Sequence, residues 1–313
     1  LAAISANAAE MTVSGATLLT YTSEDTSEVT GNQWGMKTNL GFTASGEVNG
    51  YNVSYMQTSA DQFAGMSSAR LSVDMGDAGV IAFDQGSGSG LATIDDKTPT
   101  AAEEIWDGLD AATGNADGLV GAAGNKGVFN YVNTFAGVGI NAAMRTGSGA
   151  NNSDGSSSGA GGSAWDFALT GSAGIDGLAT GIGYGEAEAG DIGNNDKHDK
   201  HWTIFGNYSF GPVTAGLQHS EIDKGALNPT NQITDAWGVA VNINDNLSVS
   251  YGEREVEYAK SGSVHVTEEG EGVAVAYTMG SIKIAGNSNE VVNNNGTQAS
   301  NDSMTEIAVS FAF

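Results

Sequence analysis

Residues 237–251 read WGVAVNINDNLSVSY. Large apolar side chains occupy every second position on both sides of Asn244-Asp245-Asn246, and Gly, Ala, Asn and Ser fill most of the positions between them. This alternation is typical of β-strands, because successive side chains of a strand point to opposite faces. Asn and Asp favour tight turns. The stretch therefore predicts a β-hairpin with one apolar face and one face of small and polar residues.

The same pattern extends in both directions along the chain. We count sixteen alternating segments, at 11–21, 34–42, 51–55, 71–75, 81–83, 129–135, 138–144, 165–169, 178–184, 202–210, 213–217, 237–243, 247–251, 273–279, 282–284 and 307–313. Short turns at 48–50, 76–79, 174–177, 211–212, 244–246 and 280–281 alternate with longer polar loops. A soluble sandwich also alternates but usually has irregular Greek-key connections. An even strand number with short turns at one rim predicts an all-β fold, a transmembrane antiparallel β-barrel of 16 strands.

The composition agrees with a large sheet. The chain has 46 glycines, only three prolines and no cysteine, which excludes disulfides and thiol chemistry. Its mean hydropathy is −0.18, and no apolar run approaches the roughly 18 residues of a spanning helix. In a membrane barrel only alternate residues meet lipid, so low hydropathy is expected. The formal net charge of −26 excludes nucleic acid as a partner, because phosphate recognition requires a basic surface.

The alternation predicts one domain with a special loop. Residues 1–9 contain the small-x-small pattern Ala6-Asn7-Ala8 and are interpreted as a signal-peptide remnant, which leaves 10–313 as a single β-barrel domain. Alternation stops between Gly86 and Lys126, so the longest loop joins the fifth and sixth strands.

This order of features resembles the trimeric 16-stranded general diffusion porins of Gram-negative outer membranes. The resemblance rests on the position of the long loop and on the aromatic C-terminus, where residues 305–313 read TEIAVSFAF. It implies an integral outer-membrane protein that forms a homotrimer and contacts lipopolysaccharide and outer-membrane lipid. It also implies insertion by the barrel assembly machinery, with Phe311 and Phe313 in the assembly signal, and a third loop that folds into the pore as the constriction (86–126).

The loop between the fifth and sixth strands is acidic. Its carboxylates are Asp95, Asp96, Glu103, Glu104, Asp107, Asp110 and Asp117, against the two lysines Lys97 and Lys126. Pro99 and the residues after it predict a short helix with acids in its first turn. Placed in a narrow pore, these carboxylates would favour cations, whereas on an ordinary surface loop they would simply be solvated.

Five basic residues are expected on the lumen side of the wall. Strand parity directs Lys37, Arg70 and Lys283 inward, and Arg145 and Arg254 share this parity nearer the loop ends. A charge facing lipid costs about 2–4 kcal/mol at the midplane, which supports the inward direction. The resemblance implies that such cations cluster opposite the acidic loop, although this set is sparse.

The sequence predicts no cofactor and no catalytic site. Clustered loop acids, Asp191 with Asp196 and Glu268 with Glu269, are candidates for binding Ca²⁺ or Mg²⁺ through carboxylate oxygens. The residues around His198 and His201 could hold a transition metal but are more often solvated. Residues 137–142 match a dinucleotide fingerprint only superficially, since a strand follows instead of a helix.

The predicted function is that of a passive channel, not an enzyme. It would let ions and small hydrophilic solutes diffuse, with a mild preference for cations. One alternative is a substrate-selective porin, which would require inward aromatic residues, of which Phe205 is one of few. Another is a surface adhesin or structural protein of the cell envelope, against which the lack of repeats and the aromatic terminus both argue.

Overall fold

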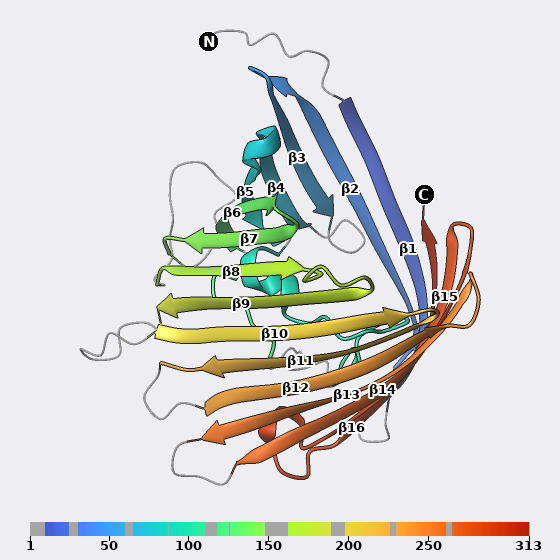
Figure 1. Ribbon diagram of the computed structural model, residues 1–313. Helices are drawn as coiled ribbons and strands as arrows, with labels where there is room; N and C mark the ends of the chain where they lie inside the picture. Colours follow the sequence, from blue (N-terminus) through green and yellow to red (C-terminus); the bar gives the residue numbers. More distant parts are fainter. Residues whose placement is uncertain are drawn as a thin grey trace.

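The computed structural model describes residues 10–24, 31–59, 65–86, 88–109, 118–124, 126–147, 162–188, 198–225, 230–260 and 265–312. These residues form one closed antiparallel barrel of sixteen strands, in which each strand pairs with its neighbours in sequence and β1 pairs with β16 (Figure 1). The strands are β1 (Glu10–Glu24), β2 (Trp34–Val48), β3 (Tyr51–Ser59), β4 (Met66–Asp74), β5 (Val80–Gln85), β6 (Lys126–Phe135), β7 (Val138–Arg145), β8 (Ala164–Gly171), β9 (Leu178–Glu188), β10 (His198–Phe210), β11 (Val213–Asp223), β12 (Thr230–Asn242), β13 (Leu247–Lys260), β14 (Val266–Met279), β15 (Ile282–Val292) and β16 (Asp302–Ala312). The predicted fold class is confirmed.

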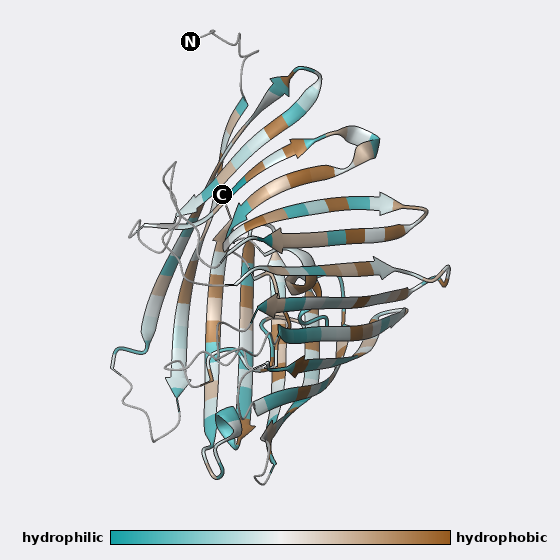
Figure 2. Cartoon of the chain, turned by 90° about the vertical axis from the view of Figure 1, so that its left-hand side faces the viewer, coloured by the Kyte–Doolittle hydropathy of each residue, from teal (hydrophilic) through white to brown (hydrophobic). Residues whose placement is uncertain are grey.

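The two faces of the wall carry different side chains, as the alternation predicts. Along each strand, apolar and polar residues alternate (Figure 2). Where β1 closes on β16, Thr17 lies opposite Phe311 on the outer face, and Leu18 lies opposite Ser310 on the inner face. Large apolar side chains are exposed on the outer face of nearly every strand, among them Leu19, Phe42, Leu71, Phe129, Ile182, Ile204, Leu217, Val273, Ile284 and Ile307. An exposed apolar surface of this extent indicates contact with an apolar medium.

The connections at one rim are tight turns. Asn49 and Gly50 join β2 to β3 with φ angles of 53° and 86°, and Ala136 and Gly137 join β6 to β7 with 52° and 81°. Two consecutive residues with positive φ are the signature of the two-residue hairpin turn that matches the twist of the strands. Asn and Gly adopt this conformation at the lowest steric cost.

Partway along the strands toward the opposite rim, aromatic side chains on the outer face donate hydrogen bonds to carboxylates. The indole nitrogen of Trp237 donates to Glu253 at 3.2 Å, and that of Trp202 donates to Glu221 at 3.0 Å. The Tyr251 hydroxyl donates to both Glu253 and Glu271. Aromatic rings with one polar end suit the boundary between an apolar layer and water. These residues therefore mark the edge of the apolar surface on the side away from the tight turns.

The connection from β5 to β6 differs from the prediction. The 3-10 helix η3 (Gly90–Ile94) lies before Pro99, and residues 99–107 form turns, not a helix. Side chains of the wall bond the backbone of this stretch: the Ala101 N–H donates to Ser250 Oγ, and the Glu104 and Asp107 carbonyls accept from Asn289. Tertiary hydrogen bonds therefore override the local helix signal. None of the helices in the described part of the chain is long and apolar enough to cross a membrane.

Candidate functional site

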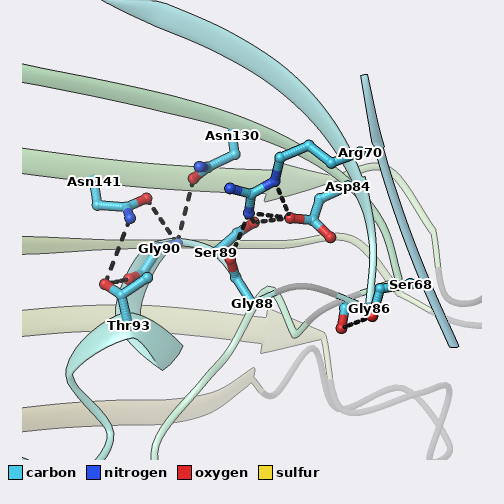
Figure 3. A network of polar contacts seen from close by, with 10 residues as sticks. All are labelled: Ser68, Arg70, Asp84, Gly86, Gly88, Ser89, Gly90, Thr93, Asn130 and Asn141. Atoms are coloured by element: carbon cyan, nitrogen blue, oxygen red, sulfur yellow. Dashed lines mark hydrogen bonds and ion pairs between the residues drawn. The ribbon is translucent and has the colours of Figure 1, made fainter. Parts of the chain in front are cut away.

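The first part of the long loop is fixed to the inner face by an ion pair between β4 and β5. The guanidinium of Arg70 donates through Nε to Asp84 Oδ2 at 2.8 Å and through a terminal nitrogen to the Gly88 carbonyl at 2.7 Å (Figure 3). Ser89 donates to the same carboxylate oxygen at 3.1 Å, and Asp84 is fully buried. Arg70 does lie on the inner face, but its charge is used to hold the loop and is balanced by Asp84.

A single carboxylate on β8 then binds both the outgoing segment of the loop, at Leu91, and its returning segment, at Ala123. Asp166 is buried and accepts the Leu91 N–H at 3.1 Å and the Ala123 N–H at 2.7 Å. Leu91 and Ile94 pack with apolar residues of the returning limb and the wall, namely Val120, Ala168, Phe205 and Ile222. Phe205, the inward aromatic residue noted in the sequence, therefore belongs to this small core.

The middle of the loop crosses several strands on the inner face. Asn207 of β10 donates to the Lys97 carbonyl at 2.6 Å, and Gln218 of β11 donates to the carbonyls of Ile94 and Asp95, both at 2.9 Å. Asn289 of β15 donates to the Glu104 and Asp107 carbonyls at 3.2 and 2.9 Å. The loop backbone is thus bonded to inner-face side chains from β10 through β15.

Arg254 fixes the far end of this crossing. It lies on the inner face of β13 with 3% of its surface exposed, and its guanidinium carbon stands 4.9 Å from the ring centre of Trp106. Glu268 of β14 lies 3.7 Å away and also accepts the Asn295 N–H at 2.8 Å. Arg254 therefore joins the loop to the wall and is not a cation open to the lumen.

Glu268 and Glu269 do not form the expected acidic pair. Glu268 is buried on the inner face, whereas Glu269 is exposed on the outer face, because adjacent residues of β14 point to opposite sides.

Within the described ranges, no group of three or more His, Asp or Glu side chains is arranged to hold a metal ion. His201 instead accepts the Gly121 N–H at 3.3 Å. Asp191 and Asp196 lie outside the described residues.

The remaining two wall cations lie near the loop carboxylates. Lys37 of β2 is exposed and Lys283 of β15 is half-buried, both on the inner face. Burial raises the pKa of Glu103, the Asp107 and Glu104 carboxylates add to this effect, and the ammonium groups of Lys283 and Lys37 oppose it. Burial also raises the pKa of Asp107, as do Glu306 and Glu104, against the effect of Lys37. These couplings place the loop acids and the two lysines within electrostatic reach of one another.

The remaining residues predicted for the pore and for assembly lie in the first part of the loop, on the wall or on the outer face, or outside the described residues. Burial raises the pKa of Asp95 to about 6, and burial also raises the pKa of Asp96, which accepts the Thr98 N–H. Arg145 lies on the inner face of β7, two residue pairs along the ladder from Asp166. Phe311 is exposed on the outer face of β16. Asp110, Asp117 and Phe313 lie outside the described residues, and the side chain of Lys126 is not described.

Sequence reasoning missed the residues that hold the loop. Asp166, Asn207, Gln218 and Asn289 all stand at inward positions, the first three with a Gly, Ala or Ser at the next inward position on at least one side, and Asn289 opposite Gly272. A large polar side chain among Gly, Ala and Ser was the available signal. Its partners, backbone groups of a distant loop, have no signature in the sequence.

No family model matches this sequence, and no curated protein is similar to it at the level of sequence. Solved structures are similar in fold. A loop-deletion mutant of OmpT, an outer membrane protein of Vibrio cholerae, aligns with a TM-score of 0.69 at 14% identity over 98% of this chain and 100% of that chain. The anion-selective porin from Comamonas acidovorans aligns with 0.68 at 11% identity over 98% and 100%. The outer membrane channel DcaP of Acinetobacter baumannii aligns with 0.68 at 13% identity over 97% of both chains. The barrel of this chain is therefore a porin fold.

Proposed function

We propose that this protein is a passive channel of a bacterial outer membrane through which ions and small hydrophilic solutes diffuse, with a preference for cations. The observation that carries the proposal is the pair of faces: exposed apolar residues outside, and inside a charged surface where Lys37 and Lys283 act electrostatically on Glu103, and Lys37 also acts on Asp107. The porin fold of the neighbouring structures supports the same function. A solute that follows the lumen would pass between these two sets of charges.

In this proposal the loop constricts the channel. Its backbone is bonded to the inner face from β10 to β15, so the acids after Pro99 project toward the inner face of β15, β16, β1 and β2. Carboxylates on one side and ammonium groups on the other create a field across the passage. Water and counter-ions must fill the gap, because unpaired buried charges are too costly.

The charge balance favours cations. The three loop carboxylates of Glu103, Glu104 and Asp107, together with Glu306 of β16, outnumber the ammonium groups of Lys37 and Lys283, because Arg70 and Arg254 are engaged with Asp84 and Glu268. Selectivity is not a property of the fold itself, since one structural neighbour is described as an anion-selective porin. It depends on the few side chains at this position.

The outer surface supports a membrane location and an oligomer. We propose that the apolar belt contacts outer-membrane lipid and lipopolysaccharide, and that the chain assembles as a homotrimer, as one neighbouring structure does by its description. We also propose that the barrel assembly machinery inserts the chain by recognising the C-terminal residues Phe311 and Phe313. Divalent cations at acidic loops such as that of Asp191 and Asp196 remain part of this proposal.

A planar-bilayer recording of the purified protein in a KCl gradient tests the function. We expect stepwise conductance and a reversal potential of the sign that cation preference gives. A protein that folds as a sheet-rich oligomer in detergent yet produces no conductance steps would contradict the channel proposal. A reversal potential of anionic sign would contradict the selectivity alone.

A further inference from the structure

A row of four glycines crosses the inner face beneath the long loop. Gly216 of β11 lies opposite Gly238 of β12, Gly238 opposite Gly252 of β13, and Gly252 opposite Gly272 of β14. The row ends in an asparagine on each side, because Gly216 also lies opposite Asn207, and Gly272 lies opposite Asn289. With strands about 4.8 Å apart, the six positions span about 24 Å of the wall.

Backbone conformation does not require glycine at these four positions. None of them is among the residues with positive φ, so alanine could adopt the same backbone. Glycine inside a strand also weakens it, because it has more freedom to lose and no side chain to pack. The reason for the row must therefore be space above the strands.

The loop fills this space. A β-carbon at Gly238 would lie 2.8 Å from the Pro99 carbonyl oxygen, and one at Gly216 would lie 2.8 Å from Pro99 Cδ and closer still to Asn207 Oδ1. A β-carbon at Gly272 would lie 3.0 Å from Ile105 Cβ and closer still to Asn289 Oδ1, and one at Gly252 would lie 3.4 Å from Ile105 Cγ2 and 2.9 Å from the Trp237 carbonyl oxygen. Pro99 thus sits on the first half of the row and Ile105 on the second.

The asparagines at the two ends bind the loop backbone beside these contacts. Asn207 donates to the carbonyl of Lys97, two residues before Pro99, and Asn289 donates to the carbonyls of Glu104 and Asp107, on either side of Ile105. Two separate features, the lack of β-carbons along the row and the hydrogen bonds of the asparagines at its ends, therefore act on the same stretch of loop. That stretch carries Glu103, Glu104 and Asp107.

We propose that the glycine row with its two asparagines is a seat that sets how far the loop projects into the lumen, and hence the aperture of the channel and its size limit for solutes. This inference rests on the proposed channel function. An alanine at Gly216, Gly238 or Gly272 would lift the loop toward Lys37 and Lys283 and narrow the passage, because each β-carbon would lie 3.0 Å or less from a loop atom. The seat makes the aperture a property of the wall, and not only of the loop sequence.

Gly238→Ala tests the seat most directly. Its β-carbon would meet Pro99 backbone, which cannot rotate away, at a distance 0.6 Å short of the 3.4 Å where ordinary contact begins. Gly41→Ala is the matched control, because it is an inward glycine of β2 whose β-carbon would meet only wall atoms of Ser14 and Thr58. Gly206→Ala on the outer face, with nothing within 4 Å, is the second control.

We expect Gly238→Ala to lower the single-channel conductance and the largest poly(ethylene glycol) that enters the channel, while both controls match the wild type. Equal conductance and size limit in Gly238→Ala and Gly41→Ala would overturn the seat. Replacing residues 97–107 by a short Gly-Ser linker should abolish the effect of Gly238→Ala, since no loop then remains to be lifted. An effect that persists in this background would also count against the proposal.

A second pair of variants covers the case in which Gly238→Ala fails to fold. Gly272→Ala should reduce conductance, and adding Ile105→Ala should restore part of the loss, because the alanine side chain would compete for space with Ile105 as well as with Asn289 Oδ1. Additive effects would contradict the seat. If the wild type itself does not conduct, the channel proposal fails. Faster hydrogen exchange of the 97–107 amides in Gly238→Ala would still support the seat, and unchanged exchange would refute it.

Discussion

The inner face of the barrel has two unlike halves. On β9 to β14, inward residues such as Gly183, Thr203, Gln218 and Ser250 are buried beneath the loop. On β1 and β2, inward residues such as Thr12, Ser14, Lys37 and Asn39 are exposed. Both halves alternate in the same way and belong to one closed sheet. The comparison shows that alternation determines which way a side chain points. Whether an inward side chain is buried or exposed to the lumen depends on whether the loop covers it.

The largest difference between the halves should appear when a buried carboxylate is removed. Asp166→Ala would leave the Leu91 and Ala123 N–H groups without an acceptor, at about 1–3 kcal/mol each, or about 2–6 kcal/mol in total. Hydrogen exchange of the loop amides measures this local stability. Asn39→Ala on the open half should change it by no more than about 0.5 kcal/mol. Similar values for the two variants would mean that the halves are not distinct.

Apolar truncation should separate the halves by a smaller amount. Leu91 is fully buried among Ile94, Val120 and Phe205, so Leu91→Ala should cost about 2–5 kcal/mol of loop stability. Leu18 points inward from β1 but is only half-buried, and Leu18→Ala should cost about 1 kcal/mol. Thermal unfolding in detergent, together with protease sensitivity of the loop, gives both values. A larger cost for Leu18→Ala would refute a packed core beneath the loop.

Substitutions of charged residues should change the ion selectivity of the channel. The direction of the change should depend on whether the loop acids or the lysines of the wall are neutralised. Glu103→Gln, Glu104→Gln and Asp107→Asn together should move the reversal potential toward anions, and Lys37→Gln with Lys283→Gln should move it toward cations. A unit charge about 4 Å from an ion in water is worth about 1 kcal/mol, or about fivefold in ion occupancy. Both shifts should shrink between 0.1 M and 1 M salt as the Debye length falls from about 10 Å to about 3 Å.

Arg70 provides the contrast within this series. Because its charge is balanced by the buried Asp84, Arg70→Gln should shift the reversal potential less than the lysine pair does and should lower loop stability more. A shift as large as that of Lys37→Gln with Lys283→Gln would show that Arg70 faces the passage.

The smallest expected effect is that of pH on selectivity. The pKa values of Glu103 and Asp107 are raised by burial and by neighbouring carboxylates, and that of Asp95 is raised to about 6. These groups lose negative charge as the pH falls, and they do so at a higher pH than ordinary carboxylates. Cation preference should therefore begin to decline at a higher pH than ordinary carboxylates would give. In the variant with Glu103, Glu104 and Asp107 neutralised, a decline of the same size would assign the effect to other groups.

Much of the architecture could be predicted from the alternation of residue types, because successive side chains of a strand point to opposite faces of the sheet. The sixteen strands, the tight turn at Asn49-Gly50 and the inward direction of all five basic residues follow from the period of two and from turn chemistry. Local reasoning failed where a distant partner decides the outcome. Pro99 and the acids after it predict a helix, yet Ser250 and Asn289 take up the backbone groups of that stretch.

By itself, then, the sequence determined the closed sheet and the polarity of its two faces, because strand side chains alternate whatever surrounds them. Only the tertiary structure decided which inward charges are free. Arg70 and Arg254 have the same parity as Lys37 and Lys283, but the first two hold the loop through Asp84 and Trp106 while the other two face its acids. The physical reason is that a charge is neutralised by the groups that strand register and loop packing bring beside it, here Asp84 across from Arg70 and Trp106 above Arg254, and strand parity carries no information about those partners.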